Sequence, residues 1–178
     1  MIQFDAVLLR PAGPEKSQGW MFLTLPEKAS KAMPSRGLVS VRGQFNGKEF
    51  AATLSPDGEG GHWFKVPTEL SKNYDAGQTV HLEIEPSEVE PEPEVPQDLR
   101  EALGAAPQLA QAAWADITPT ARRDWIHWMT SGKKAETRVK RITAAMDMLS
   151  KGKRRPCCFD RSGQYSNSLS CPVADGQK

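Results

Sequence analysis

Residues 39–54, VSVRGQFNGKEFAATL, predict a β-hairpin more clearly than any other part of the chain. Apolar and polar side chains alternate on both sides of Asn46-Gly47, which is the period of a strand with one buried face. An Asn-Gly pair between two such runs is typical of a type I′ turn, because both central residues of that turn need positive φ. We therefore expect two antiparallel strands joined at Asn46-Gly47.

Further short strands are expected on either side of this hairpin. The segments with a strand pattern are 2–8, 19–25, 62–66 and 79–85, with a short helix at 26–33 and a turn at 55–58. Short strands at this spacing, separated by Gly and Pro, fit a small barrel that leaves few open strand edges. Residues 1–86 are therefore predicted to form a β-barrel domain.

Residues 87–97, SEVEPEPEVPQ, are expected to be a linker. Repeated Pro–acid steps interrupt helices and sheet ladders, and they favour an extended, semi-rigid connector. Residues 75–98 hold eight Asp or Glu side chains and no Lys or Arg, while the basic residues are concentrated in the last third of the chain. This asymmetry indicates either two modules with an acidic connector or only a solvated, soluble surface.

The next segment, residues 98–152, has the pattern of a helical module, so the whole chain is assigned to the α+β class. Four helices are expected, beginning near Asp98, Pro107, Thr118-Pro119 and Ala135. Thr118 followed by Pro119 is a typical N-cap and first helical position. In the last helix, the spacing predicts a buried stripe made of Val139, Ile142, Met146 and Leu149.

Residues 153–178 show no periodicity and are expected to be a disordered tail. The odd count of Cys157, Cys158 and Cys171, two of them adjacent, predicts free thiols, since it fits neither a disulfide framework nor a four-ligand zinc pattern. No run approaches the ~18 apolar residues of a membrane span, and the N-terminus lacks the pattern of a signal peptide. We therefore expect a cytoplasmic protein.

Two ordered sets of residues resemble known bacterial families. The first set is Phe4, Ala6, Gly19-Trp20, the run from Val39 to Gly47, Phe50, Leu54, Gly77 and Val80. The second set is Ala102-Leu103, Trp128-Met129, Lys133, Glu136-Thr137-Arg138 and Arg141-Ile142. The first resembles a domain of unknown function with a double-split β-barrel fold, and the second resembles the YdeI- or OmpD-associated bacteriocin-protection family. The resemblance covers roughly residues 1–155, and it departs at Gly132, where the family usually has Ala.

What this resemblance implies is tolerance of bacteriocins or of cationic antimicrobial stress. It brings no catalytic residue, no cofactor and no metal with it. The residues themselves agree, because His62 and His81 make a poor metal site without a third ligand, and no nucleophile–base pattern is evident. We therefore expect a non-enzymatic protein that binds either a small anion or a protein partner; the oligomeric state is left open.

The candidate ligand-binding residues are Trp128, Lys133, Arg138 and Arg141. Arg138 precedes Ile142 by four residues, so it shares the apolar face of the last helix and needs a partner there. It could belong to an anion pocket with Arg141 and Lys133, because guanidinium groups suit carboxylates and phosphates. The alternative is an internal salt bridge; the candidate acceptors are Asp116, Asp124 and Glu101. Trp128 is expected either to pack on the barrel or to act as a recognition anchor.

A second candidate site is the basic cluster Lys151, Lys153, Arg154 and Arg155. Such a cluster can bind nucleic acid through phosphate contacts. It is short and contains no aromatic residue, so the alternative is a solvated helix end. Nucleic-acid association is therefore the second functional hypothesis.

Overall fold

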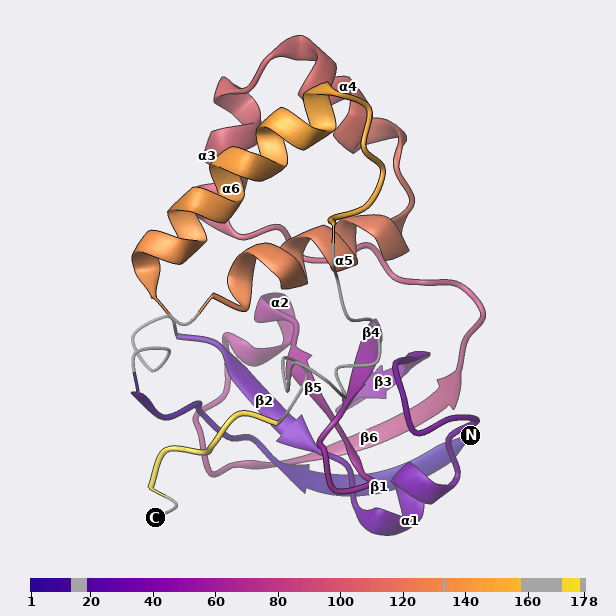
Figure 1. Ribbon diagram of the computed structural model, residues 1–178. Coiled ribbons are helices and arrows are strands. Elements are labelled where there is room, and N and C mark those ends of the chain that lie inside the picture. The colour runs from indigo at the N-terminus through magenta and orange to yellow at the C-terminus, as the bar shows by residue number, and fades with distance from the viewer. Residues whose placement is uncertain (14–18, 133, 158–170, 177–178) are drawn as a thin grey trace. The chain divides into compact units, whose positions relative to one another are not determined.

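The computed structural model describes residues 1–13, 19–132, 134–157 and 171–176 (Figure 1). The chain divides into two compact units, Met1–Pro91 together with Ser162–Lys178, and Glu92–Arg161. The described part of the first unit is rich in strands, and that of the second is helical. The predicted α+β class, with strands first and helices after, is confirmed.

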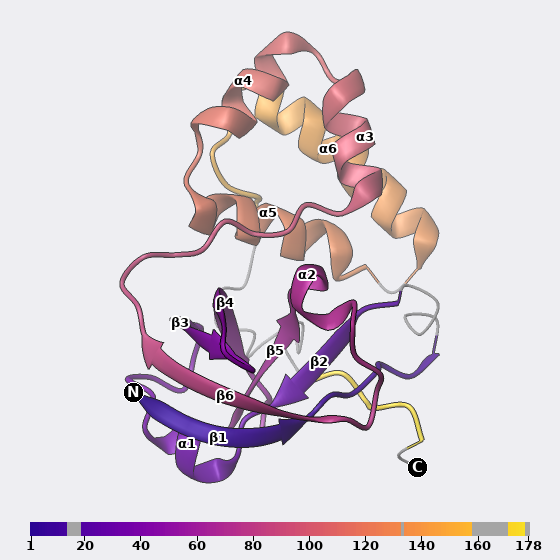
Figure 2. The ribbon, with the colours of Figure 1, turned by 180° about the vertical axis from the view of Figure 1, so that it is seen from behind.

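The first unit contains a single antiparallel sheet among its described residues (Figure 2). Its strands are β1 (Ile2–Val7), β2 (Met21–Thr24), β3 (Val39–Phe45), β4 (Lys48–Pro56), β5 (His62–Val66) and β6 (Thr79–Pro86). They lie in the order β1-β6-β3-β4-β5-β2, and a bridge between Leu9 and Phe22 connects the two ends of this order. The sheet therefore curls into a small barrel. Helix α1 (Glu27–Lys31) was predicted, whereas α2 (Thr68–Ser71) is only four residues long and gave no periodic signal.

The predicted hairpin is formed by β3 and β4. Asn46 and Gly47 have φ of 47° and 80°, and the strand pairing runs from Phe45 opposite Lys48 to Val39 opposite Leu54. On the other side of β3, Gly43 pairs with Ile84 of β6. A Cβ atom at position 43 would lie 1.8 Å from the backbone oxygen of Glu83, so only glycine permits this approach of the two strands.

The linker carboxylates are bound to the units on either side of Pro91. Glu90 accepts hydrogen bonds from Ser40 Oγ and Thr53 Oγ1, both at 2.8 Å. Glu92 accepts from Arg122 Nη1 at 2.7 Å. The Glu90 contacts lie within the first unit, and the Glu92 contact lies within the second.

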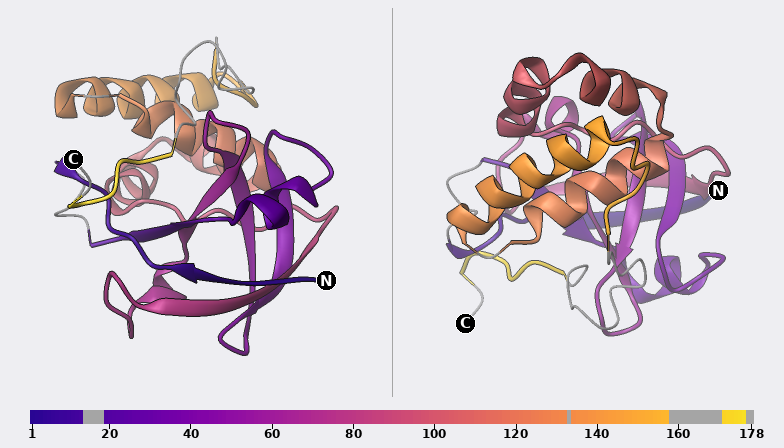
Figure 3. Two further views of the ribbon diagram at one scale, coloured as in Figure 1. Left: turned by 90° about the horizontal axis from the view of Figure 1, so that it is seen from below. Right: turned by 45° about the horizontal axis from the view of Figure 1, so that its top comes forward.

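The second unit has four helices in its described residues (Figure 3). They are α3 (Gln97–Ala105), α4 (Gln108–Asp116), α5 (Pro119–Thr130) and α6 (Ala135–Ser150). The predicted cap is present, because the Thr118 side chain accepts a hydrogen bond from the backbone N–H of Ala121. Trp125, Met129 and Leu149 are fully buried in the core of this unit. The predicted helices are therefore confirmed.

The predicted stripe of α6 is wrong at one position. Val139 is 63% exposed, whereas Ile142, Ala145 and Leu149 are buried. Because each residue of a helix turns by about 100°, Ala145 and Leu149 place the centre of the buried face on the side of Arg138 rather than of Val139. One turn before Ile142, the buried face of α6 is therefore occupied by Arg138.

The expected tail falls largely on residues 158–170 and 177–178, which lie outside the described residues. The expectation of disorder is wrong for the short segment around Ala174, which is 3% exposed and forms a bridge with Pro11. Backbone hydrogen bonds from Ala12 N to Val173 O and from Asp175 N to Arg10 O flank that bridge. Backbone pairing of this kind needs no hydrophobic period, so the sequence pattern gave no sign of it.

Of the helices in the described ranges, none has the length and apolarity that a membrane crossing requires.

Candidate functional site

Arg138 pairs with Asp98 within the helical unit. Its Nε donates to Asp98 Oδ2 at 2.5 Å, and its Nη2 donates to Asp98 Oδ1 at 2.8 Å. Two parallel bonds of this kind match the planar guanidinium to the carboxylate. Asp98 lies in the first turn of α3, so the pair connects α3 to α6. The acceptor is none of the three expected, Asp116, Asp124 or Glu101, but the pair is an internal salt bridge.

Arg141 is bound to the end of α5. Its Nη1 donates to the backbone oxygen of Trp128 at 2.7 Å and to Ser131 Oγ at 2.9 Å, and its guanidinium carbon lies 5.5 Å from the centre of the Trp128 ring. A cation at the last carbonyls of a helix satisfies their unpaired acceptors and complements the helix dipole. The Trp128 ring also contacts Trp125 edge-to-face, with 6.0 Å between ring centres.

The structure thus brings Arg141 and Trp128 together and directs Arg138 to Asp98. Lys133, the fourth expected ligand-binding residue, lies outside the described residues. Both arginines hold helices of the second unit against each other. Both guanidinium groups already donate hydrogen bonds within the unit. An anion that binds here would have to compete with these acceptors.

We expect Arg138→Ala to destabilise the helical unit by about 1–2 kcal/mol, less than a fully buried pair, because the two side chains are 26% and 46% exposed. The neighbouring guanidinium holds the pKa of Asp98 below its usual value. The contribution of the pair is therefore present at neutral pH and is lost as the pH falls through the lowered pKa of Asp98. Urea unfolding of the wild type and the variant at neutral and at strongly acidic pH measures this.

Lys140→Ala serves as the matched control, since Lys140 is an exposed cation on the same helix. It should change the free energy of unfolding by less than ~0.5 kcal/mol. A loss for Arg138→Ala that stays constant down to the lowest pH would contradict the assigned pair.

The basic cluster at the end of α6 is largely engaged by carboxylates of the same unit. Lys151 Nζ lies 2.7 Å from Asp147, Arg154 Nη1 lies 2.5 Å from Asp116, and Arg155 pairs with Asp124. Lys153 is exposed, and its side chain makes no hydrogen bond or ion pair with another described residue. Three of these four cations are ion-paired but remain exposed, so a solvated helix end stays a prediction for this cluster.

The backbone of the segment that follows α6 also forms a hydrogen bond with α5. Trp125 Nε1 donates to the backbone oxygen of Arg154 at 3.2 Å, and Asp124, the acceptor for Arg155, is only 1% exposed. Arg154 holds the pKa of Asp116 below its usual value. The partners are far apart in sequence, and for that reason the charge pattern alone could not identify them.

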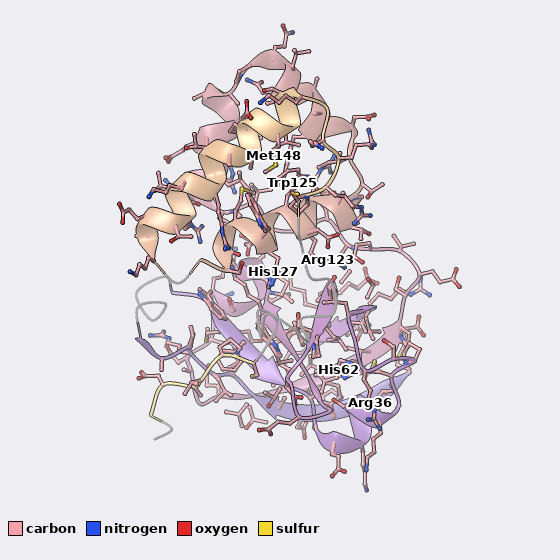
Figure 4. All side chains as sticks on the ribbon, viewed as in Figure 1. Arg36, His62, Arg123, Trp125, His127 and Met148 are labelled. Atoms are coloured by element: carbon pink, nitrogen blue, oxygen red, sulfur yellow. The ribbon has the colours of Figure 1, made fainter. Side chains whose placement is uncertain are left out.

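Two histidines of the barrel lie in contrasting surroundings. His62, labelled in Figure 4, is 1% exposed, and its Nε2 lies 3.2 Å from the backbone oxygen of Gly37. His81 is exposed, and its Nδ1 lies 2.7 Å from Asp5 Oδ1. In the part of the chain that the structure describes, no three His, Cys, Asp or Glu side chains lie together in a way that could hold a metal ion.

A hollow of about 520 Å³ lies in the barrel unit, and it was not identified from the sequence. Its lining comes from the segment that leads into β3 and from the end of β6. The lining residues are Pro34, Ser35, Leu38, Val39, Ser40, Pro86, Ser87 and Glu88. The hollow is open to solvent. The two segments are some fifty positions apart, so only the pairing of β3 with β6 creates this hollow.

Two protein-family models match the chain, each over a separate range of residues. Residues 92–152 match the family OmdA, described as bacteriocin-protection, YdeI or OmpD-associated. Residues 4–84 match DUF1905, a domain of unknown function. No curated protein matches the chain significantly.

Proposed function

Because the chain joins a DUF1905 domain to a YdeI- or OmpD-associated domain of the bacteriocin-protection type, we propose that it is a non-enzymatic stress-tolerance protein that acts in the cytoplasm by binding a protein partner. The family description supports the stress role. Binding is preferred to catalysis because Arg138 and Arg141, within the matched residues 92–152, donate hydrogen bonds to Asp98 of α3 and to Trp128 of α5.

The observation that carries the choice of partner is the engagement of Arg138 and Arg141. A small anion would need guanidinium groups that can turn toward it. Arg138 already donates twice to Asp98, and Arg141 donates to Trp128 and Ser131. An incoming anion would have to displace a charged or helix-capping contact, at a cost of one to a few kcal/mol. A protein partner, which contacts a larger surface, avoids this cost.

The nucleic-acid hypothesis receives less support from the contacts around the basic cluster. Arg154 and Arg155 are paired with Asp116 and Asp124, and Lys151 is paired with Asp147. Each phosphate contact made by these residues would first require an internal ion pair to open. Lys153 alone gives a single phosphate contact, which is too few for tight binding at physiological salt.

The stress role can be tested by survival. A bacterium that is sensitive to a bacteriocin is made to produce the full chain, and colonies are counted over a range of bacteriocin doses. We expect more survivors than in cells that produce an unrelated protein at the same level. Survival after heat shock serves as a second control for a general effect on growth. Equal survival with and without the protein at every dose would refute the bacteriocin-protection role.

A further inference from the structure

The hollow of the barrel unit has a mixed lining, with an apolar part formed by Pro34, Leu38, Val39 and Pro86. Pro34 and Leu38 come from the segment before β3, and Pro86 comes from the end of β6. The volume of about 520 Å³ lies within the ~300–1,000 Å³ typical of ligand sites in proteins. Because the hollow is open to solvent, it suits a segment that lies along the surface better than an enclosed small molecule.

The serine hydroxyls around the hollow are already engaged. Ser35 Oγ accepts from Gly37 N at 3.2 Å, and Ser40 Oγ donates to Glu90 at 2.8 Å. Ser87 Oγ interacts with both the backbone N–H and the oxygen of Val89 at 3.2 Å. The polar recognition that the hollow can offer therefore depends mainly on its carboxylate.

That carboxylate belongs to Glu88, which is exposed and whose side chain makes no hydrogen bond or ion pair with another described residue. Residues 75–98, the segment that contains Glu88, hold eight Asp or Glu side chains and no Lys or Arg. Arg42 of β3 is bound to Glu85 at 2.8 Å. Arg36 lies in the loop before β3 but is not among the lining residues. A carboxylate beside apolar walls complements a cation that carries apolar neighbours.

We propose that this hollow binds a basic peptide segment of a partner protein, in which a Lys or Arg side chain pairs with Glu88 and an adjacent apolar side chain packs on Pro34, Leu38 and Pro86. The inference rests on the proposed partner-binding function and specifies the chemistry of the partner. It does not depend on the stress in which the protein acts. The alkyl stem of Lys or Arg can itself cover apolar surface while its charged end reaches the carboxylate.

The test uses the full chain and a synthetic nine-residue peptide in which Lys and Leu alternate, with binding measured by calorimetry at low and at physiological salt. The wild type should bind this peptide, and the affinity should fall as the salt concentration rises. Glu88→Gln should weaken binding about tenfold, which corresponds to the loss of ~1.4 kcal/mol. A peptide of alternating Glu and Leu should not bind.

Glu49→Gln is the matched control, because it removes the same charge from an exposed position of β4 outside the lining. It should leave the affinity unchanged within about twofold, as expected for a charge that contributes only to the general field. Equal affinities of the wild type and Glu88→Gln for the basic peptide, or no binding at low salt, would overturn the inference. Loss of binding in Glu88→Gln together with unchanged survival under bacteriocin would uphold the site and reject the stress role as its purpose.

Discussion

Gly43→Ala is expected to destabilise the barrel unit by about 3–5 kcal/mol, one of the largest effects available to a single methyl group. The added Cβ would lie 1.8 Å from Glu83 O and 2.9 Å from Ile84 Cα. Both atoms belong to the backbone of β6, so no side-chain rotation can relieve the overlap. The strands would have to separate, and the paired residues from Val41 to Phe45 would lose their ladder.

Thermal and urea unfolding, followed by circular dichroism in the strand region, would measure this loss. Gly104→Ala is the matched control, because a Cβ at that helical position meets nothing within 4 Å. It should stabilise the chain by about 0.5–1 kcal/mol, since glycine is a poor helix former. A Gly43→Ala protein that unfolds within ~1 kcal/mol of the wild type would show that β3 and β6 are farther apart than described.

Trp125→Ala should strongly destabilise the helical unit. Trp125 is completely buried, packs against Trp128, and donates its indole N–H to the backbone oxygen of Arg154. Truncating a buried tryptophan typically costs ~3–5 kcal/mol. A unit of this size has a total stability of about 3–10 kcal/mol, so the loss is at least about a third of the total. Helical circular dichroism at 25 °C should fall accordingly.

Two further variants separate the sources of this effect. Trp125→Phe retains an aromatic ring but loses the hydrogen bond to Arg154, and it should cost a smaller amount, about 1–3 kcal/mol. Leu109→Ala removes a large apolar side chain that is 70% exposed, and it should change stability by less than ~0.5 kcal/mol. If Trp125→Ala melted at the same temperature as Leu109→Ala, Trp125 would not be the centre of this core.

The features predicted correctly from the sequence are those with local causes. The Asn46-Gly47 turn and the Thr118-Pro119 helix start depend on residues within a few positions of each other. The sheet order, by contrast, depends on which distant strands pair, and no periodicity encodes that choice. The same reason explains Val139, because the face of α6 that becomes buried is chosen by neighbouring helices and not by α6 alone.

The candidate site was predicted only in part for the same physical reason. The helical period correctly placed Arg138 on the face of α6 that needs a partner, and Asp98 provides that partner. Choosing Asp98 among many carboxylates requires the packing of α3 on α6. Arg154 and Arg155 seemed free because Asp116 and Asp124 are more than thirty positions away. The hollow near Glu88 has no sequence signature, since its two walls meet only through strand pairing.

The contacts of Glu90 and Glu92 have a consequence for how such a chain could arise. Glu90 is bound by Ser40 and Thr53 of the first unit, and Glu92 is bound by Arg122 of the second. A genetic crossover at Pro91 would therefore leave both carboxylates with their own partners. A crossover a few codons earlier would remove Glu90 from the first module, and the hydroxyls of Ser40 and Thr53 would lose their acceptor. Pro91 is thus a point at which the chain can be divided while Glu90 and Glu92 keep these partners, but the first module also needs the segment around Ala174, which pairs with Pro11.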